Sequence, residues 1–203
     1  MTVKDPCNIK TLKINRCFCD NILPILKRFV NLEHIKLKFS ELNKDIAEFI
    51  SSLPIKTVDI EFKNTKEISL DLPNCQSIII RRISDEISTE KIRLNVPCSK
   101  YIFSENCNLL IDNFSDELLY FRYENTDDEM FERLMKLKNI KYIDIRDSFV
   151  TDISSLSDSV KYLNIKNTYI SNMISTKNIK YINAENTLIN KYIFNDTNIC
   201  FIV

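Results

Sequence analysis

A cysteine pair, a single histidine and an acidic triplet are the parts of this sequence whose residue types could do chemistry. Cys17 and Cys19 are separated by one residue, His34 is the only histidine, and residues 127–129 read Asp-Asp-Glu. A structural zinc site needs four ligands, and no second cysteine or histidine pair completes one. We therefore interpret the cysteines as structural, His34 as a solvated side chain, and the acidic triplet as the start of a helix, where acids favour the positive end of the dipole.

The sequence also lacks the residues on which common catalytic sites depend. It contains no glycine, which excludes phosphate loops and dinucleotide-binding fingerprints, and one histidine disfavours a histidine-based triad. Lysine plus arginine total 28 and aspartate plus glutamate total 28, so the net charge is zero. A neutral chain argues against nucleic acid or an anionic membrane as the main partner. We expect a non-enzymatic protein with no cofactor and no metal.

No apolar segment points to export or to membrane insertion. The first ten residues, MTVKDPCNIK, lack the apolar core of a signal peptide, and apolar runs such as 78–80 are far shorter than a membrane span. We therefore expect a cytoplasmic protein with no membrane partner, whose seven cysteines are reduced.

A repeated frame organises most of the chain. Apolar residues at the first, fourth and sixth positions precede a small polar residue at the ninth, as in Ile140, Ile143, Ile145 and Ser148. Three late copies read NIKYIDIRDS, SVKYLNIKNT and NIKYINAENT. The copies begin near residues 9, 32, 55, 75, 98, 118, 140, 160, 179 and 198, in steps of 19 to 23 residues. So regular a period indicates a single repeat domain over residues 1–203.

Each copy is expected to contribute one short strand. Side chains alternate along a strand, so the third, fifth and seventh positions share one face, while the apolar positions point into the body. One copy cannot bury its own apolar residues, so the copies must stack. The ninth position, occupied by Thr126, Ser148, Thr168 and Thr187 in four copies, can bond backbone groups where the chain turns. We therefore predict a parallel sheet of about ten strands.

The longer copies leave room for helices and the shorter ones do not. Segments 20–29, 41–54 and 126–138 have helical spacing, and we expect Thr126 to cap the last of them. Segments in the shorter steps, such as 150–159, should be extended or turn-like. Between residues 63 and 117 the frame is weak and can also be drawn through Ile92 and Leu94, so its register there stays open.

This frame resembles that of the leucine-rich repeat family, LxxLxLxx(N/C/T), with isoleucine replacing much of the leucine. The resemblance covers residues 9–203. It implies an α/β solenoid, in which a curved parallel sheet lines the concave side and short helices or irregular turns form the convex side. The richness in isoleucine, asparagine and lysine also resembles the compact leucine-rich repeat proteins of large DNA viruses of insects, such as insect poxviruses. That likeness implies a host-directed adaptor or decoy acting in the host cytoplasm.

The frame also predicts which side chains face a protein partner. Tyrosine occupies the third position in four consecutive copies, and charged or amide side chains follow at the fifth and seventh. This composition is typical of protein-interaction surfaces, although tyrosine is also a good strand former and stacked rings can pack on one another without a partner. The predicted partner-binding residues are Tyr120, Arg122, Glu124, Tyr142, Asp144, Arg146, Tyr162, Asn164, Lys166, Tyr181, Asn183 and Glu185.

Two further surfaces follow from the same frame. Ile79 and Ile102 take the fifth position of successive copies and would form an exposed apolar patch, whereas a register error of one residue would bury them. Cys75 and Cys98 take first positions, where a small apolar residue belongs.

Solenoid ends without caps would expose core and a strand edge. Self-assembly through these ends, as a structural repeat protein, is therefore the alternative function.

Overall fold

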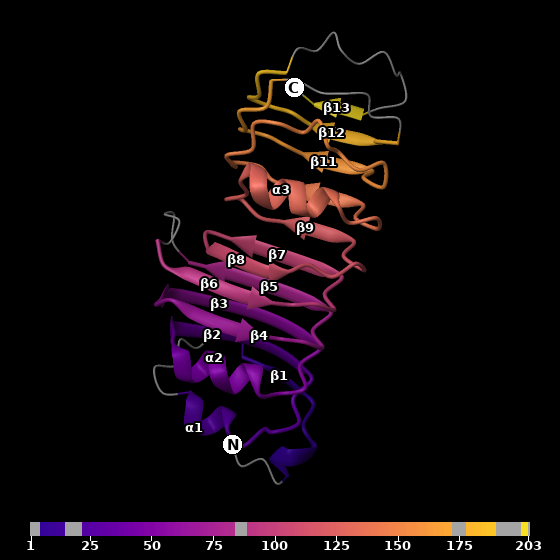
Figure 1. Ribbon diagram of the computed structural model, residues 1–203. Helices are drawn as coiled ribbons and strands as arrows, with labels where there is room; N and C mark the ends of the chain where they lie inside the picture. The colour runs from indigo at the N-terminus through magenta and orange to yellow at the C-terminus, as the bar shows by residue number, and fades with distance from the viewer. Residues whose placement is uncertain (1–4, 15–21, 84–88, 172–177, 190–199, 203) are drawn as a thin grey trace. The chain divides into compact units, whose positions relative to one another are not determined.

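The chain forms two compact units, both built mostly from parallel β-strands. The computed structural model describes residues 5–14, 22–83, 89–171, 178–189 and 200–202 (Figure 1). Unit 1 contains residues 1–99 and 104–114, and unit 2 contains residues 100–103 and 115–203. The few helices among the described residues are short, and none of them has both the length and the apolar character needed to cross a membrane. This content is compatible with the predicted α/β class.

Four strands of unit 1 follow the repeat frame. Third-position residues stand opposite one another, because Thr11 faces His34, His34 faces Thr57, and Thr57 faces Ser77. The predicted register of these four copies is therefore confirmed. The strands are parallel and pair in the order β1 (Thr11–Lys13), β2 (His34–Leu42), β3 (Thr57–Thr65) and β5 (Ser77–Arg82).

A second parallel sheet occupies the region where the repeat frame is weak. Figure 1 draws its three strands in front of β3 and β5. The family resemblance implied short helices or irregular turns outside the main sheet, and these segments are strands instead. Segments 68–71 and 108–113 lie in copies of 20 residues, for which extended structure was among the expectations. The alternation of buried residues such as Ile92 and Leu94 along these strands is the period of a half-buried strand. The sheet consists of β4 (Ile68–Asp71), β6 (Lys91–Asn95) and β8 (Asn108–Asn113), in that order.

Alternating apolar side chains from both sheets fill the core of unit 1, and a helix extends it. Helix α2 (Lys44–Ser51) buries Ile46 and Ile50, and its N-cap Asn43 accepts a hydrogen bond at Oδ1 from the backbone N of Ile46, at 3.1 Å. This helix lies within the predicted segment 41–54. Of the predicted segment 20–29 the structure describes residues 22–29, and there the helix is a single turn, α1 (Leu23–Leu26).

Six parallel strands of unit 2 also follow the frame. Each begins at the third position, and Tyr120, Tyr142, Tyr162 and Tyr181 stand opposite one another as predicted. Residues 101–103 of the first strand belong to this unit. The order is β7 (Tyr101–Glu105), β9 (Tyr120–Arg122), β10 (Tyr142–Asp144), β11 (Tyr162–Asn164), β12 (Tyr181–Asn183) and β13 (Cys200–Ile202).

The copy predicted to start at residue 98 starts one residue later. Tyr101 stands opposite Tyr120, so Ser99 takes the first position. Ser99 is fully buried, and its hydroxyl donates to the backbone O of Cys75 at 2.7 Å. Cys98 is exposed, so its assignment to the core is wrong. Ile102 is 0% exposed and cannot belong to a surface patch. A slip of one residue moves every side chain of a strand to the other face, and this copy shows that effect.

Asparagine and aspartate hold the turns that follow several strands. Asn106, Asp147, Asn167 and Asn186 have φ between 54° and 57°, in the left-handed region. All four lie at the eighth position once the register is corrected. A chain without glycine can turn in this way because asparagine and aspartate tolerate that region better than other residues. Consecutive turns are linked, since Asn167 Nδ2 donates to Asp147 Oδ1 at 2.6 Å, and Asn186 Nδ2 donates to Asn167 Oδ1 at 2.8 Å.

The ninth position bonds backbone carbonyls in unit 2, which confirms its predicted role. Thr126 does so rather than cap a helix, because helix α3 (Asp128–Met135) has Asp127 as its N-cap. Segment 150–159, in a shorter copy, contains turns and no helix, as predicted. Each threonine hydroxyl donates to the carbonyl three residues earlier: Thr126 to Tyr123 at 3.0 Å, Thr168 to Ile165 at 2.7 Å, and Thr187 to Ala184 at 2.8 Å.

Candidate functional site

Five tyrosines in register mark the sheet face of unit 2. Their rings stack where neighbouring strands meet: centroids are 4.2 Å apart for Tyr101 and Tyr120, 4.3 Å for Tyr120 and Tyr142, and 6.0 Å for Tyr142 and Tyr162. Tyr101 is missing from the predicted site because its copy was placed one residue early. We call this set the tyrosine column: Tyr101, Tyr120, Tyr142, Tyr162 and Tyr181.

Stacking determines which parts of these rings a partner can reach. The ring of Tyr120 lies nearly parallel to those of Tyr101 and Tyr142, at 14° and 13°, so both of its faces are covered. Burial raises the pKa of the Tyr120 phenol above its usual value, and the nearby Tyr101, Tyr142 and Asp144 raise it further. Burial also raises the pKa of Tyr142. The phenols therefore stay protonated near neutral pH and can donate hydrogen bonds. Tyr162 is the most open, at 42% exposed.

Three fifth-position side chains, those of Asp144, Asn164 and Asn183, turn back to their own backbone. Asp144 and Asn164 are buried, so the prediction that they contact a partner is wrong. Asn183 makes the same local bond but is only partly buried. A short polar side chain can satisfy a nearby backbone N–H in this way, and here it holds the turn after each strand. The Oδ1 atoms of Asp144, Asn164 and Asn183 accept from the backbone N of Arg146 at 3.4 Å, Lys166 at 3.2 Å and Glu185 at 3.1 Å.

The charged residues predicted for this face largely neutralise one another. Arg146 binds Asp144 through both side-chain oxygens, at 2.9 and 2.5 Å, and these hydrogen bonds raise the pKa of its guanidinium. The guanidinium of Arg122 lies 4.6 Å from the ring centroid of Phe103, and its Nη2 lies 3.4 Å from Glu124 Oε1. Lys166 and Glu185 pair at 2.7 Å.

A second set of residues, next to the tyrosines in sequence, was not among the predicted site residues. Lys141, Lys161 and Lys180 directly precede Tyr142, Tyr162 and Tyr181, at the second position of the frame. None of the three forms an ion pair within the described part of the chain. The Lys-Tyr dipeptide recurs at 100–101, 141–142, 161–162 and 180–181. This recurrence could have identified the lysines, but the predicted site included only the third, fifth and seventh positions. We call these three residues the lysine column: Lys141, Lys161 and Lys180.

The sheet face of unit 1 is made of ion pairs instead. Glu33 lies between Lys10, at 2.6 Å, and Lys56, at 2.5 Å, and hydrogen bonds from both lysines lower its pKa to about 2. Asp59 pairs with Lys36 at 2.6 Å and with Arg81 at 2.9 Å. These charges are therefore paired within the protein.

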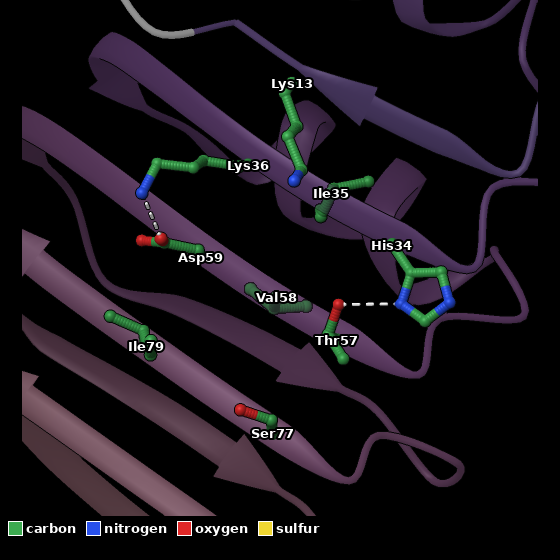
Figure 2. A pocket seen from close by; sticks show the side chains of 9 residues that line it. All are labelled: Lys13, His34, Ile35, Lys36, Thr57, Val58, Asp59, Ser77 and Ile79. Atoms are coloured by element: carbon green, nitrogen blue, oxygen red, sulfur yellow. Dashed lines mark hydrogen bonds and ion pairs between the residues drawn. The ribbon is translucent and has the colours of Figure 1, made fainter.

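A hollow of about 300 Å³ opens over β2, β3 and β5 in unit 1 (Figure 2). His34 is half-buried at one side, with Nδ1 2.9 Å from Thr57 Oγ1, rather than solvated as predicted. Ile79 is half-buried at the other side, and because Ile102 is buried the two do not form an apolar patch. The residues that line the hollow are Lys13, His34, Ile35, Lys36, Thr57, Val58, Asp59, Ser77 and Ile79.

The residues that suggested chemistry have structural surroundings where they are described. Asp127 caps α3, and Asp128 accepts at Oδ2 from the hydroxyl of Thr151 at 2.7 Å, so the acidic triplet is a helix start as interpreted. The thiol of Cys75 is buried, and burial raises its pKa to about 12, which makes it a poor nucleophile. Cys17 and Cys19 lie outside the described residues. Among the described residues no three histidine, cysteine or acidic side chains are grouped so that they could hold a metal ion.

Comparison with known proteins identifies no relative: no protein-family model, no curated protein and no solved structure matches the chain. Function must therefore be inferred from the residues and their geometry.

Proposed function

We propose that the chain is a non-enzymatic protein-interaction module, a solenoid of the leucine-rich-repeat type, that binds a protein partner on the tyrosine face of unit 2. The tyrosine column carries this proposal. Five tyrosines stand in register on one sheet face, three pairs of their rings are stacked, and Arg122 and Arg146 lie beside them. Tyrosine and arginine are among the residues enriched in binding hot spots.

Rigidity supports the same function. The stacked rings of Tyr101, Tyr120 and Tyr142 and the two hydrogen bonds between Arg146 and Asp144 hold these side chains in place before any partner arrives. A preorganised surface loses less conformational entropy on binding than a flexible one. Tyrosine has only two side-chain torsions, so it contributes a large contact area at low entropic cost.

The biological setting that we propose follows from the resemblance described above. The chain would act in the cytoplasm, and, if it is viral, in the host cytoplasm as an adaptor or decoy for a host protein. In this proposal neither a membrane nor a nucleic acid is the partner, and the protein needs no cofactor.

Capture from a cell lysate tests whether the tyrosine face binds protein. The test variant combines Tyr120→Ser, Tyr142→Ser, Tyr162→Ser and Tyr181→Ser. A matched control combines Phe149→Ser and Tyr169→Ser, because these aromatics are 59% and 62% exposed and lie outside the tyrosine column. Circular dichroism must show that both variants are folded. We expect the native chain and the control to retain the same protein and the test variant to lose it. Equal retention by all three would contradict the proposal.

Self-association is a second candidate, favoured by the edge of unit 1. Leu12 and Ile14 on the β1 side are half-buried, whereas the equivalent Ile35 and Leu37 on β2 are 3% and 1% exposed. Apolar residues at an open strand edge can pair with another chain. Light scattering over a range of protein concentrations tests this, because a mass that stays at 23.9 kDa would exclude assembly.

A further inference from the structure

The lysine column places three positive charges directly before three of the tyrosines along the chain. On this face Arg146 pairs with Asp144, and Lys166 pairs with Glu185. Lys141, Lys161 and Lys180 form no ion pair within the described residues. Lys141 and Lys180 are exposed and Lys161 is half-buried. The chain as a whole has zero net charge, so this column is a local concentration of charge and not a reflection of composition.

Backbone hydrogen bonds place the three lysines side by side. The backbone N of Lys161 donates to the backbone O of Lys141 at 2.9 Å, and the backbone N of Lys180 donates to the backbone O of Lys161 at 2.8 Å. Parallel strands are about 4.8 Å apart, so the lysine attachment points span about 10 Å. This is comparable with the Debye length at physiological ionic strength, about 8 Å, so the three charges act together on a ligand.

Like charges directly opposite one another on neighbouring strands are destabilising, and a bound ligand of opposite charge would relieve that repulsion. We propose that the partner segment bound by the tyrosine column is acidic: an extended peptide whose carboxylates bind the ammonium groups of Lys141, Lys161 and Lys180. This inference rests on the proposed function and adds the chemistry of the partner. In this proposal the tyrosine hydroxyls donate hydrogen bonds to the same carboxylates and to the peptide carbonyls.

Ring stacking favours an acidic peptide over a single-stranded nucleic acid. Proteins bind unpaired bases by stacking them on the faces of aromatic rings. Both faces of Tyr120 are occupied by Tyr101 and Tyr142, at 4.2 and 4.3 Å, so that ring offers a base only its edge and its hydroxyl. Hydrogen-bond donors and ammonium groups remain, and these suit carboxylates.

Fluorescence anisotropy with labelled oligoglutamate as the probe tests the inference, with oligoglutamine and oligothymidylate as comparison probes. The test variant is Lys141→Gln/Lys161→Gln/Lys180→Gln. The control Lys66→Gln/Lys136→Gln/Lys138→Gln removes the same charge from exposed lysines outside the column. A third variant, Lys141→Arg/Lys161→Arg/Lys180→Arg, keeps the charge. We expect oligoglutamate to bind the native chain, the control and the arginine variant alike, and to bind the test variant about tenfold more weakly at low salt.

Three results would overturn the inference. Oligoglutamate could fail to bind the native chain, the control could lose as much affinity as the test variant, or oligothymidylate could bind more tightly than oligoglutamate. The last result would instead indicate a nucleic-acid surface. Lysate capture separates this inference from the proposed function: retention that depends on the tyrosines but is unchanged by Lys141→Gln/Lys161→Gln/Lys180→Gln contradicts only the acidic partner.

Discussion

The second position of the frame distinguishes the two units. In unit 1 it carries Lys10, Glu33 and Lys56, each directly before one of three neighbouring strands, and the central carboxylate pairs with both lysines. In unit 2 the lysine column occupies the same position without an acid between its members. The backbone geometry of the two sites is the same, because in both the backbone N of one copy donates to the preceding copy at this position. The residue type in the middle of each set therefore decides whether the lysines beside it form ion pairs within the described residues.

The largest effect on stability is expected when a paired carboxylate is removed, and the two units should differ because that of unit 2 is buried and that of unit 1 is partly exposed. Asp144→Ala removes a carboxylate whose side chain is 0% exposed and leaves Arg146 and Arg122 without it. We expect the free energy of unfolding to fall by about 3 kcal/mol, as for other broken buried pairs. Asp59→Ala in unit 1 removes a carboxylate that is 20% exposed, and should cost about 1 kcal/mol. Urea denaturation measures both.

Asp144→Asn serves as the matched control, since Asn164 and Asn183 occupy the same position in the next two copies. Its amide oxygen can still accept from the backbone N of Arg146, so it should cost less than Asp144→Ala. Equal losses for Asp144→Ala and Asp59→Ala would show that burial does not separate the two faces.

A smaller effect is expected at the turns, which the two units share. Asn167→Ala in unit 2 and Asn106→Ala in unit 1 place alanine at φ of 56° and 54°. Each should lower the free energy of unfolding by about 1–2 kcal/mol, the cost of the left-handed region for a residue with a Cβ. Glycine at the same positions should cost less, because it has no Cβ. A loss in one unit only would mean that the turns are not equivalent; chemical denaturation of the four variants decides this.

The smallest effect concerns acid stability and belongs to unit 1. The pKa of Glu33 is lowered from 4.5 to about 2, so the folded state binds this proton more weakly than the unfolded chain does. Its contribution to stability is therefore present above pH 4.5 and is lost as the pH falls toward about 2. We expect Glu33→Gln to flatten the fall in melting temperature over this range, and added salt to do the same. Thermal melts between these pH values would contradict the prediction if the native chain and the variant show parallel curves.

Much of the fold followed from the repeat frame alone. Nine of the ten predicted starting positions agree with the strand register, because the fourth- and sixth-position side chains must point to one side of a strand. The remaining starting position, at residue 98, was predicted one residue too early, because both Tyr101 and Ile102 are apolar enough to occupy a core position in the sequence pattern. Only packing shows that Ile102 is the buried one. The three-stranded sheet was hidden for a related reason, because its short alternating runs fit two frames.

The candidate site, like the fold, was predicted only in part from the sequence. Residue types and spacing in the sequence determine that tyrosines stand in one row on a sheet face, because side chains two apart on a strand share a face and successive copies align. Tertiary structure alone decides which neighbours are accessible. It buries Asp144 and Asn164, adds Tyr101, and covers both ring faces of Tyr120. It also determines that Lys56 pairs with Glu33, whereas Lys161 forms no ion pair within the described residues. Pairing depends on which side chains meet across strands that are about 20 residues apart in the chain, and only folding brings those strands together.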